Sequence, residues 1–213
     1  MAMSETFKIG TKSPDLYLNY NKGHFVTNHS HSNYYIDITT QKSCLSEAKA
    51  VAKALLPTYK MSIMVDTILC LDGMEVIGTC LAEMLTRSDY SSVNSNKDIN
   101  ILAPEYTTGN QLIFRDNNVS MINGKNVLIL AANVVTGYTS LTAIEAINYY
   151  GGRVAGIASV FAAVSECGGV AVTSAFDTAD LPDYSSTTAM ECPMCKRKER
   201  IDALINNFGC SKL

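Results

Sequence analysis

Hydroxyl residues and a glycine follow an apolar run in the middle of the chain. Residues 127–131 are all apolar, and Thr136, Gly137, Thr139 and Ser140 come a few positions later. A helix N-terminus carries unpaired amide groups and a partial positive charge, and hydroxyls there add further donors. We therefore interpret the segment as a phosphate-binding loop that contains Thr136, Gly137, Thr139 and Ser140. The same residues could also do no more than cap a helix.

The elements around this loop form a recognisable unit. Residues 127–131 suit a strand covered on both faces, and the apolar spacing from Leu141 predicts a helix that Gly151-Gly152 ends. Residues 154–164 form another apolar run. Strand, helix and strand make a parallel crossover, and ligands of such sheets collect at the carboxyl ends of the strands.

A similar unit precedes it. Residues 61–71 predict a buried strand, Asp72-Gly73 a turn, and residues 76–85 a helix. Asn123-Gly124 predicts a hairpin-type turn. The sequence therefore predicts an α/β fold with a mostly parallel central sheet and helices on both faces.

The ends of the chain are patterned less clearly. Residues 1–40 contain few aliphatic side chains and are interpreted as a hood over the core. Ser43 begins a predicted helix that Pro57 ends, and residues 201–207 predict another helix.

Composition limits the size and the class of the protein. With 213 residues, 47% hydrophobic and 17% charged, the chain predicts a single domain, 1–213. Residues 43–184 would form its core, with residues 1–42 and 185–213 as hood and terminal additions. A net charge of −3 without long runs disfavours nucleic acid and membrane as partners. Residues 1–12 are polar and do not resemble a secretion signal, so we expect a cytoplasmic protein.

Cysteine and histidine offer possible metal ligands. Seven cysteines are an odd number, which fits a reducing compartment better than a disulfide framework. Cys192 and Cys195 have the spacing of half a zinc site or of a redox pair, but no second pair follows at ribbon spacing. The sequence therefore disfavours a structural zinc, which a distant ligand such as Cys167 or Cys210 would have to complete. The histidines (His24, His29, His31) are interpreted as residues of solvated turns rather than ligands.

Two other phosphate-binding motifs do not fit. A dinucleotide-binding unit needs three spaced glycines, whereas Gly137 stands alone after the strand. No Gly-Lys-Ser/Thr occurs for a Walker-type loop.

The chain resembles the orotate phosphoribosyltransferases over most of its length. Gly23-His24-Phe25 and the segment from Ser32 to Asp37 are similar to that family's N-terminal signature, and Gly124 to Thr139 with Tyr150-Gly151-Gly152 to its central segment. The resemblance implies that residues 135–140 hold the 5′-phosphate of phosphoribosyl diphosphate (PRPP). These residues are Val135, Thr136, Gly137, Tyr138, Thr139 and Ser140. It also implies that Leu71, Asp72 and Gly73 hold the diphosphate, with Mg²⁺, and that Tyr34 and Tyr35 stack on a base.

Three departures from the family pattern bear on catalysis. The two acidic positions before the loop fall on Ala131 and Ala132, which removes carboxylates that would hold the ribose hydroxyls. Residues 104–110 supply no cation where the family has a basic loop, and the nearest candidates are Lys97 and Arg115. Glu75 adds negative charge beside the expected diphosphate, which is unfavourable unless Mg²⁺ lies between them.

The sequence thus predicts a phosphoribosyltransferase that acts on a pyrimidine-like, orotate-like base, with turnover slower than is usual in the family. A non-catalytic PRPP-binding or nucleotide-binding regulatory protein on the same fold is the alternative. The resemblance also implies a homodimer.

Overall fold

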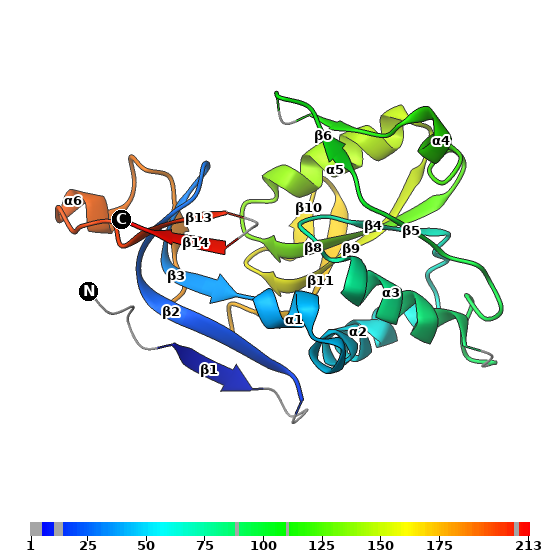
Figure 1. Ribbon diagram of the computed structural model, residues 1–213, viewed down its shortest axis with the longest axis horizontal. Helices are drawn as coiled ribbons and strands as arrows, with labels where there is room; N and C mark the ends of the chain where they lie inside the picture. The colour runs from blue at the N-terminus through cyan, green and yellow to red at the C-terminus, as the bar shows by residue number, and fades with distance from the viewer. Residues whose placement is uncertain (1–5, 11–14, 88–89, 110, 207–208) are drawn as a thin grey trace. The chain divides into compact units, whose positions relative to one another are not determined.

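The computed structural model describes residues 6–10, 15–87, 90–109, 111–206 and 209–213. Parts of the segments 1–12, 104–110 and 201–207 discussed above lie outside these ranges. The described chain divides into two compact units, one formed by residues 41–177 and the other by residues 1–40 and 178–213. Figure 1 traces both units along the chain.

The larger unit is built on a sheet with the strand order β10-β11-β9-β8-β4-β5. The neighbours from β11 to β5 pair in parallel, and only β10 pairs antiparallel, so the predicted mostly parallel sheet is confirmed. The strands are β4 (Thr67–Cys70), β5 (Asn100–Leu102), β8 (Asn126–Val134), β9 (Arg153–Ala162), β10 (Glu166–Cys167) and β11 (Val170–Asp177).

The order of these strands contains a switch point. From β4 the chain first moves to β5 on one side, and β8, β9 and β11 then follow on the other side. In open parallel sheets, ligands bind in the crevice outside the carboxyl ends of the strands where the order reverses. The carboxyl ends of β4 and β8 are therefore the candidate ligand-binding edge of this sheet.

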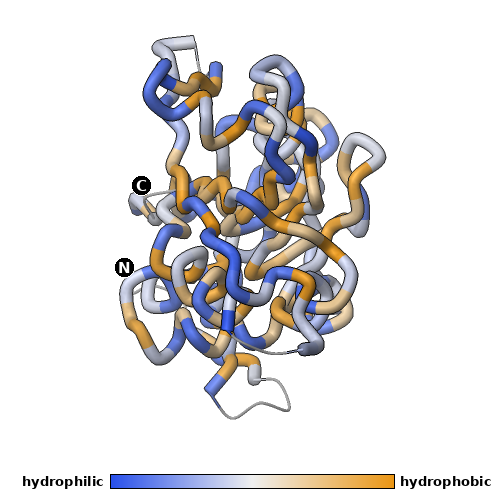
Figure 2. Tube along the Cα trace, turned by 90° about the vertical axis from the view of Figure 1, so that its right-hand side faces the viewer, coloured by the Kyte–Doolittle hydropathy of each residue, from blue (hydrophilic) through white to orange (hydrophobic). Residues whose placement is uncertain are grey.

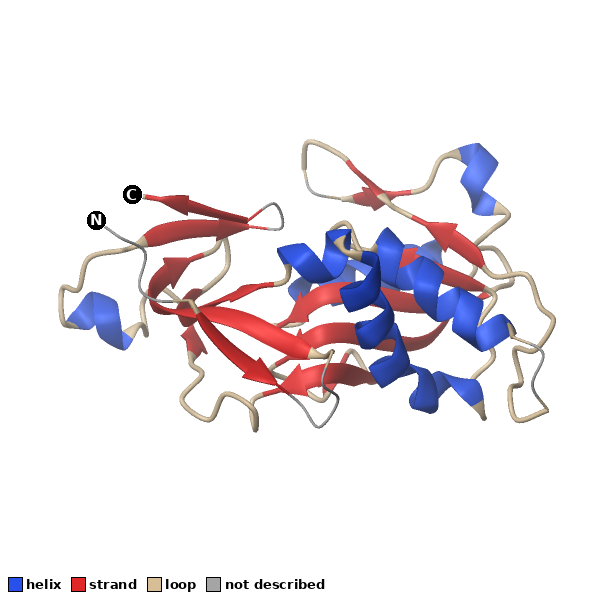
Figure 3. Ribbon diagram, turned by 60° about the horizontal axis from the view of Figure 1, so that its bottom comes forward, coloured by secondary structure: helices blue, strands red, loops and turns tan. Residues whose placement is uncertain are grey.

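Helices cover both faces of this sheet (Figure 3). Helix α3 (Glu75–Thr86) approaches β4 closely at Gly78. A Cβ added to this glycine would lie 2.5 Å from Cys70 Sγ. Helix α2 (Leu45–Lys60) lies on the same face. Helix α5 (Tyr138–Tyr149) packs on the opposite face, where Ala143 and Ile147 join a cluster that includes Leu69. Successive side chains of a strand, such as Leu69 and Cys70, point to opposite faces of the sheet. One therefore packs against α5 and the other against α3.

Short elements complete the larger unit. They are α1 (Thr39–Ser43), which begins just before its boundary, β6 (Glu105–Tyr106), β7 (Leu112–Ile113) and α4 (Asp116–Val119). β6 and β7 form a small antiparallel pair. The Asn123-Gly124 turn joins α4 to β8, so it does not close a hairpin as the sequence predicted.

Both termini contribute to a second, mixed sheet, which confirms the hood built from the two ends of the chain. Its order is β12-β3-β2-β13-β14, with β1 also paired to β2. The elements are β1 (Phe7–Gly10), β2 (Tyr17–Val26), β3 (His31–Asp37), β12 (Ser186–Thr187), α6 (Pro193–Lys196), β13 (Ala203–Asn206) and β14 (Gly209–Lys212). The C-terminal β13 pairs in parallel with β2 through Ala203 and Leu204.

Some boundary predictions are wrong. Helix α2 continues past Pro57 to Lys60, because Tyr59 is buried and its hydroxyl donates a hydrogen bond to the carbonyl of Ile157 at 3.0 Å. The strand expected at residues 61–71 is confined to Thr67–Cys70. Within the segment 201–207, where the sequence predicted a helix, Ala203–Asn206 form strand β13 instead. The strand forms because β2 and β14 pair with it.

Figure 2 colours the trace by hydropathy, and hydrophobic stretches alternate with hydrophilic ones along it. Within the described residues, no helix has the length and apolar character needed to span a membrane.

Candidate functional site

Two turns with left-handed backbone lie at the switch point of the parallel sheet. Asp72 and Gly73 have φ values of 58° and 78° after β4, and Gly137 has a φ of 77° after β8. Cys70 of β4 is directly paired with Leu130 of β8, so the two strands end at the same sheet edge. Each turn leads into a helix, α3 or α5. The arrangement brings two helix N-termini to the crevice where an anion would bind.

Gly137 is required by its position at the start of α5. A Cβ at this residue would lie 2.7 Å from Cys167 Sγ, which itself donates to the carbonyl of Gly137. Gly137 has no side chain that could cap the helix, and the amide of Tyr138 donates to Thr136 Oγ1 at 3.5 Å. The first amides of a helix have no intrahelical partners, so this end of α5 can donate to an anion. Around Gly137, Thr136 and Thr139 are exposed, Ser140 is buried and Tyr138 is 57% exposed. The loop therefore presents backbone amides and two exposed hydroxyls.

The turn after β4 contains a carboxylate that lacks a full set of partners. Asp72 Oδ1 is buried and accepts no hydrogen bond from the described residues. Burial raises the pKa of Asp72, while Lys42 and a hydrogen bond from the backbone amide of Ala132 act in the opposite direction. Leu71 is fully buried, and its amide donates to Leu130, so Asp72 and Gly73 are the residues of this turn that can face a ligand.

The cations near this edge differ from those that the sequence suggested. Lys97 lies 3.6 Å from Asp66, and Arg115 forms a 2.6 Å ion pair with Glu105, so both are already paired with acids. Lys42 was missed by sequence reasoning, although its charge acts on Asp72 and its chain passes close to Gly73. No motif marks Lys42, because it precedes the first strand of the unit and reaches the turn only through the fold.

Tyr106 of β6 also interacts electrostatically with this carboxylate. Burial, followed by the charge of Asp72, raises the pKa of Tyr106 to about 12. The phenol is thus neutral near neutral pH, and the β6–β7 pair brings a hydroxyl rather than a cation into the neighbourhood of the turn.

Phosphoribosyltransferases are among the solved structures whose fold is similar to this chain. Leishmania donovani UMP synthase matches with a TM-score of 0.56 at 17% identity, over 76% of this chain and 34% of that one. The chain thus spans about a third of that protein. The phosphoribosyltransferase of Corynebacterium diphtheriae matches with a TM-score of 0.53 at 17% identity, over 76% of this chain and 90% of the other.

The Mycobacterium tuberculosis orotate phosphoribosyltransferase, solved with Fe(III) dicitrate, gives a TM-score of 0.52 at 17% identity, with 77% and 92% of the two chains covered. The chain has the type I phosphoribosyltransferase fold. No protein-family model and no curated protein sequence matches the chain.

On this phosphoribosyltransferase fold, the end of the strand before residues 135–140 lacks carboxylates. Ala131 and Ala132 near the end of β8 are 2% and 5% exposed, and Ala131 belongs to the apolar cluster beneath α5. The backbone amide of Ala132 nevertheless donates to Asp72. A carboxylate from the neighbouring strand end thus lies against this position.

Tyr34 and Tyr35 of β3 have different surroundings. Tyr34 packs between Tyr20 and Tyr184 and lines a cavity of about 500 Å³ together with Lys22 and Arg200. Tyr35 packs against Phe25 in the core of the terminal unit, and burial raises its pKa to about 12. Of the two candidate base-stacking residues, Tyr34 is the one beside a cavity.

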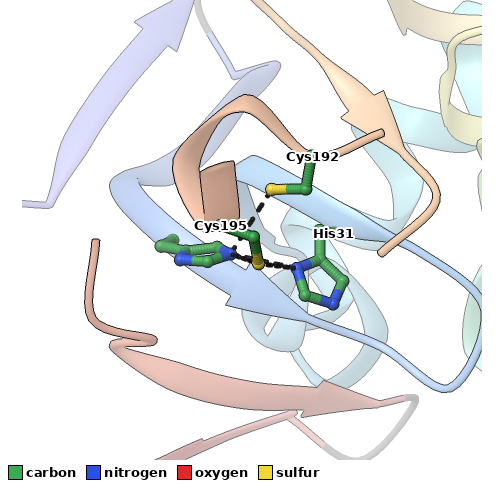
Figure 4. Close-up of side chains that lie close together, drawn as sticks. His31, Cys192 and Cys195 are labelled. Carbon is green, nitrogen blue, oxygen red and sulfur yellow. Dashed lines mark hydrogen bonds between the residues drawn. The ribbon is translucent and has the colours of Figure 1, made fainter. Parts of the chain in front are cut away.

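The terminal unit also assembles four nitrogen and sulfur ligands at one point. His24, His31, Cys192 and Cys195 each direct one donor atom to a cluster in which all four atoms lie within 4.8 Å of one another. Figure 4 shows Cys192, Cys195 and His31 pointing toward one another. His24 Nε2 lies 3.0 Å from His31 Nδ1. Such a set of two imidazoles and two thiols can hold a transition metal.

This cluster corrects the expectation that a structural zinc is disfavoured. The predicted half-site Cys192–Cys195 is completed by His24 and His31, rather than by Cys167 or Cys210. The reason is that β2 and the start of β3 lie beside the C-terminal segment that carries both cysteines. The separate signals, a Cys-x-x-Cys pair and closely spaced histidines, were both present in the sequence.

Burial and neighbouring groups shift the pKa values of two members of the cluster, His31 and Cys192. Burial, followed by the charge of His24, lowers the pKa of His31. Burial opposes ionisation of Cys192, but hydrogen bonds from the backbone amides of Cys195 and Met194 lower its pKa overall. The third histidine, His29, is exposed and is not a member of the cluster.

Proposed function

We propose that the protein binds PRPP at the carboxyl edge of its parallel sheet and transfers the phosphoribosyl group to a pyrimidine-like, orotate-like base. The observation that carries this proposal is the pair of left-handed turns at the adjacent ends of β4 and β8. Two anion-accepting turns at one switch point suit a ligand with two separate phosphate groups, which is the chemistry of PRPP.

Each turn has its own role in the proposal. The 5′-phosphate binds at residues 135–140, where the amides at the start of α5 and the exposed hydroxyls of Thr136 and Thr139 donate to its oxygens. The diphosphate binds at Asp72-Gly73, and Lys42 supplies positive charge there. Gly73 allows the backbone to approach a phosphate because it has no side chain.

Asp72 takes over part of the role of the missing acidic pair. Its carboxylate reaches the amide of Ala132, and its Oδ1 has no partner among the described residues. A ribose hydroxyl could donate to that oxygen, and the negative charge would stabilise positive charge that develops at the anomeric carbon. A single carboxylate supplies less stabilisation than two, which is why we propose slow turnover.

The same residues fit Mg²⁺, because a hard cation prefers carboxylate oxygens and substrate phosphates. Asp72 and Glu75 would hold it, since both carboxylates flank Gly73 and one oxygen of Asp72 lacks a partner. When bound with PRPP, the ion offsets the charge of the diphosphate leaving group. Glu75 is compatible with the diphosphate only in that arrangement.

A non-catalytic PRPP or nucleotide sensor is the second candidate. It is favoured by the ion pair between Arg115 and Glu105, which leaves the β6–β7 pair without the unpaired cation that would cover a diphosphate. A sensor would use the same phosphate loop and would need no stabilisation of a transition state.

Phosphorus NMR of the purified protein with PRPP and Mg²⁺ separates the two candidates. Orotate, uracil and purine bases are added in parallel samples. Protein-dependent release of diphosphate with one base supports the transferase and names its acceptor. Shifted or broadened PRPP signals without release support the sensor, whereas unchanged signals contradict both.

The acceptor and the assembly are further parts of the proposal. Tyr34, which lines a cavity of the terminal unit, is the candidate for stacking on the base, whereas Tyr35 packs in the core of that unit. We also propose a homodimer, because the family that the sequence resembles is dimeric. Light scattering after size-exclusion chromatography tests the assembly, and a monomer at micromolar concentration would contradict it.

A further inference from the structure

The distances within the histidine–cysteine cluster match a tetrahedral metal site. With zinc bonds of about 2.0–2.1 Å to nitrogen and about 2.3 Å to sulfur, the edges of a tetrahedron are about 3.3 Å for two nitrogens and about 3.6 Å for nitrogen and sulfur. His24 Nε2 and His31 Nδ1 are 3.0 Å apart. His24 Nε2 lies 3.6 Å from the sulfurs of both Cys192 and Cys195, and Cys195 Sγ lies 3.3 Å from His31 Nδ1.

The hydrogen bonds around the cluster orient its donors. His24 Nδ1 lies 3.3 Å from the carbonyl oxygen of Glu199, so this nitrogen carries the proton and donates it. The lone pair of Nε2 is therefore directed at the other three ligands, as the second shell of a metal-bound histidine requires. Cys192 Sγ accepts hydrogen bonds from the amides of Met194 and Cys195 and from the hydroxyl of Thr187, which suits a thiolate.

Three of the four ligands are buried, and Cys195 is half-buried. His24 is 2% exposed, Cys192 is fully buried and His31 is 9% exposed. Four protein ligands fill a tetrahedral coordination sphere, so no position remains for a catalytic water. A redox disulfide between Cys192 and Cys195 would not account for two imidazole nitrogens directed at the same point.

We propose that His24, His31, Cys192 and Cys195 bind one structural Zn²⁺. Zinc is assigned because it prefers tetrahedral sites of mixed imidazole and thiolate ligands. The metal crosslinks the β2–β3 hairpin to the segment around α6. It reinforces the contacts that already join the two, which include the pairing of β12 with β3, the pairing of β13 with β2 and the hydrogen bonds of His24 with Asp202 and Glu199.

The crosslink also holds the walls of the cavity beside Tyr34. The cavity is lined by Lys22 and His24 of β2 and by Met194 and Arg200 of the segment around α6. Each of these two segments also carries ligands of the proposed metal site. Loss of the metal therefore loosens the cavity walls as well as the terminal sheet.

Metal analysis of the native protein, purified under reducing conditions without an affinity tag that binds metal, is the first test. Mass spectrometry of the digested protein should give about one zinc per chain. Titration with a mercurial that attacks thiolates, followed with a chromogenic zinc chelator, should release that zinc. Replacement by Co²⁺ should give the visible absorption bands of tetrahedral cobalt with sulfur ligands.

Variants identify the ligands. Cys195→Ser and His31→Ala should lower the zinc content to a small fraction of one equivalent. The controls Cys44→Ser and His29→Ala should retain about one equivalent, because both side chains are exposed and lie outside the cluster. If the ligand variants do not fold, the cobalt spectrum and the zinc release of the unaltered protein still decide the question.

Three results would overturn the proposal. They are a native protein without zinc that also fails to bind Zn²⁺ or Co²⁺ after reduction, a stoichiometric metal other than zinc, and retention of one zinc in both ligand variants. None of these results bears on PRPP binding, which is assigned to residues of the other unit.

Discussion

The proposed phosphate-binding edge of the parallel sheet and the histidine–cysteine cluster are built in opposite ways. Residues 135–140 are contiguous, and their geometry follows from one strand, one turn and one helix start. The ligands of the cluster come from both ends of the chain and meet only because β2, β3 and α6 lie together. A local site can be read from a motif, whereas a site assembled from distant segments depends on the completed fold.

The two regions also differ in whether the protein supplies all the partners that their polar atoms need. In the cluster, four protein donors face one another and complete a coordination sphere. At the sheet edge, Asp72 Oδ1 is buried and accepts no hydrogen bond from the described residues, which is the state expected of a group that binds a ligand. In our proposals, the cluster therefore serves stability and the edge serves binding.

Removing a cluster ligand should have the largest effect on stability. We expect Cys195→Ser to cost roughly 3–5 kcal/mol and to lower the melting temperature by about 10 °C, because metal binding contributes directly to folding. Differential scanning calorimetry measures the shift, and limited proteolysis locates it in the terminal sheet. Cys44→Ser is the matched control. An equal loss in both variants would contradict the assigned role.

Asp72→Asn should separate binding from turnover. Asn tolerates the left-handed backbone at this position, so the fold should persist. If Asp72 stabilises the transition state, we expect roughly 100-fold slower diphosphate release, with PRPP affinity changed far less. Single-turnover kinetics and calorimetric titration measure the two quantities. Unchanged turnover would remove Asp72 from the proposed mechanism.

Gly137→Ala tests whether the phosphate loop is special among left-handed turns. Gly124 has a similar φ of 72° but nothing within 4 Å of an added Cβ, whereas at Gly137 the Cβ would meet Cys167 Sγ at 2.7 Å. Backbone strain alone costs about 1–2 kcal/mol in each variant. We expect Gly137→Ala to lose roughly 1–3 kcal/mol more, as overpacking does, and to lose PRPP binding.

Urea denaturation with phosphorus NMR makes this comparison between the glycines. Gly124→Ala should keep PRPP binding. If the two variants lose the same stability and both bind PRPP, the loop geometry is not the binding determinant.

Lys42→Met should weaken PRPP binding about five- to tenfold, since one partly exposed charge contributes on the order of 1 kcal/mol. Lys53→Met on α2 is the control, because Lys53 is exposed and its charge does not act on Asp72. The effect should shrink as salt rises. Titration calorimetry at two ionic strengths checks both statements, and equal affinities for the two variants would contradict the role of Lys42.

The smallest effect concerns pH. Burial raises the pKa of Asp72, so the folded protein holds this proton more tightly than the unfolded chain does. Stability from Asp72 is therefore present below its unfolded pKa and lost as pH rises through the raised value. Asp72→Asn should then be more stable than the unaltered protein at pH 7, by on the order of 1 kcal/mol, and the gain should vanish in acid. Denaturation curves at several pH values measure it.

The sequence by itself determined the α/β class, the buried strand β8, the loop at residues 135–140 and the turn at Asp72-Gly73. Each of these follows from neighbouring residues, because hydrophobic period and turn chemistry act over a few positions. The sequence also determined that Ala131 and Ala132 carry no carboxylates.

Only the tertiary structure decided which distant residues contact these local features. It brought Lys42 to Asp72, set Asp72 against Ala132, paired Arg115 with Glu105 and made residues 203–206 a strand rather than a helix. It also joined His24 and His31 to Cys192 and Cys195. The physical reason is that sheet pairing and burial bring distant segments together, and no local pattern records which segments will meet.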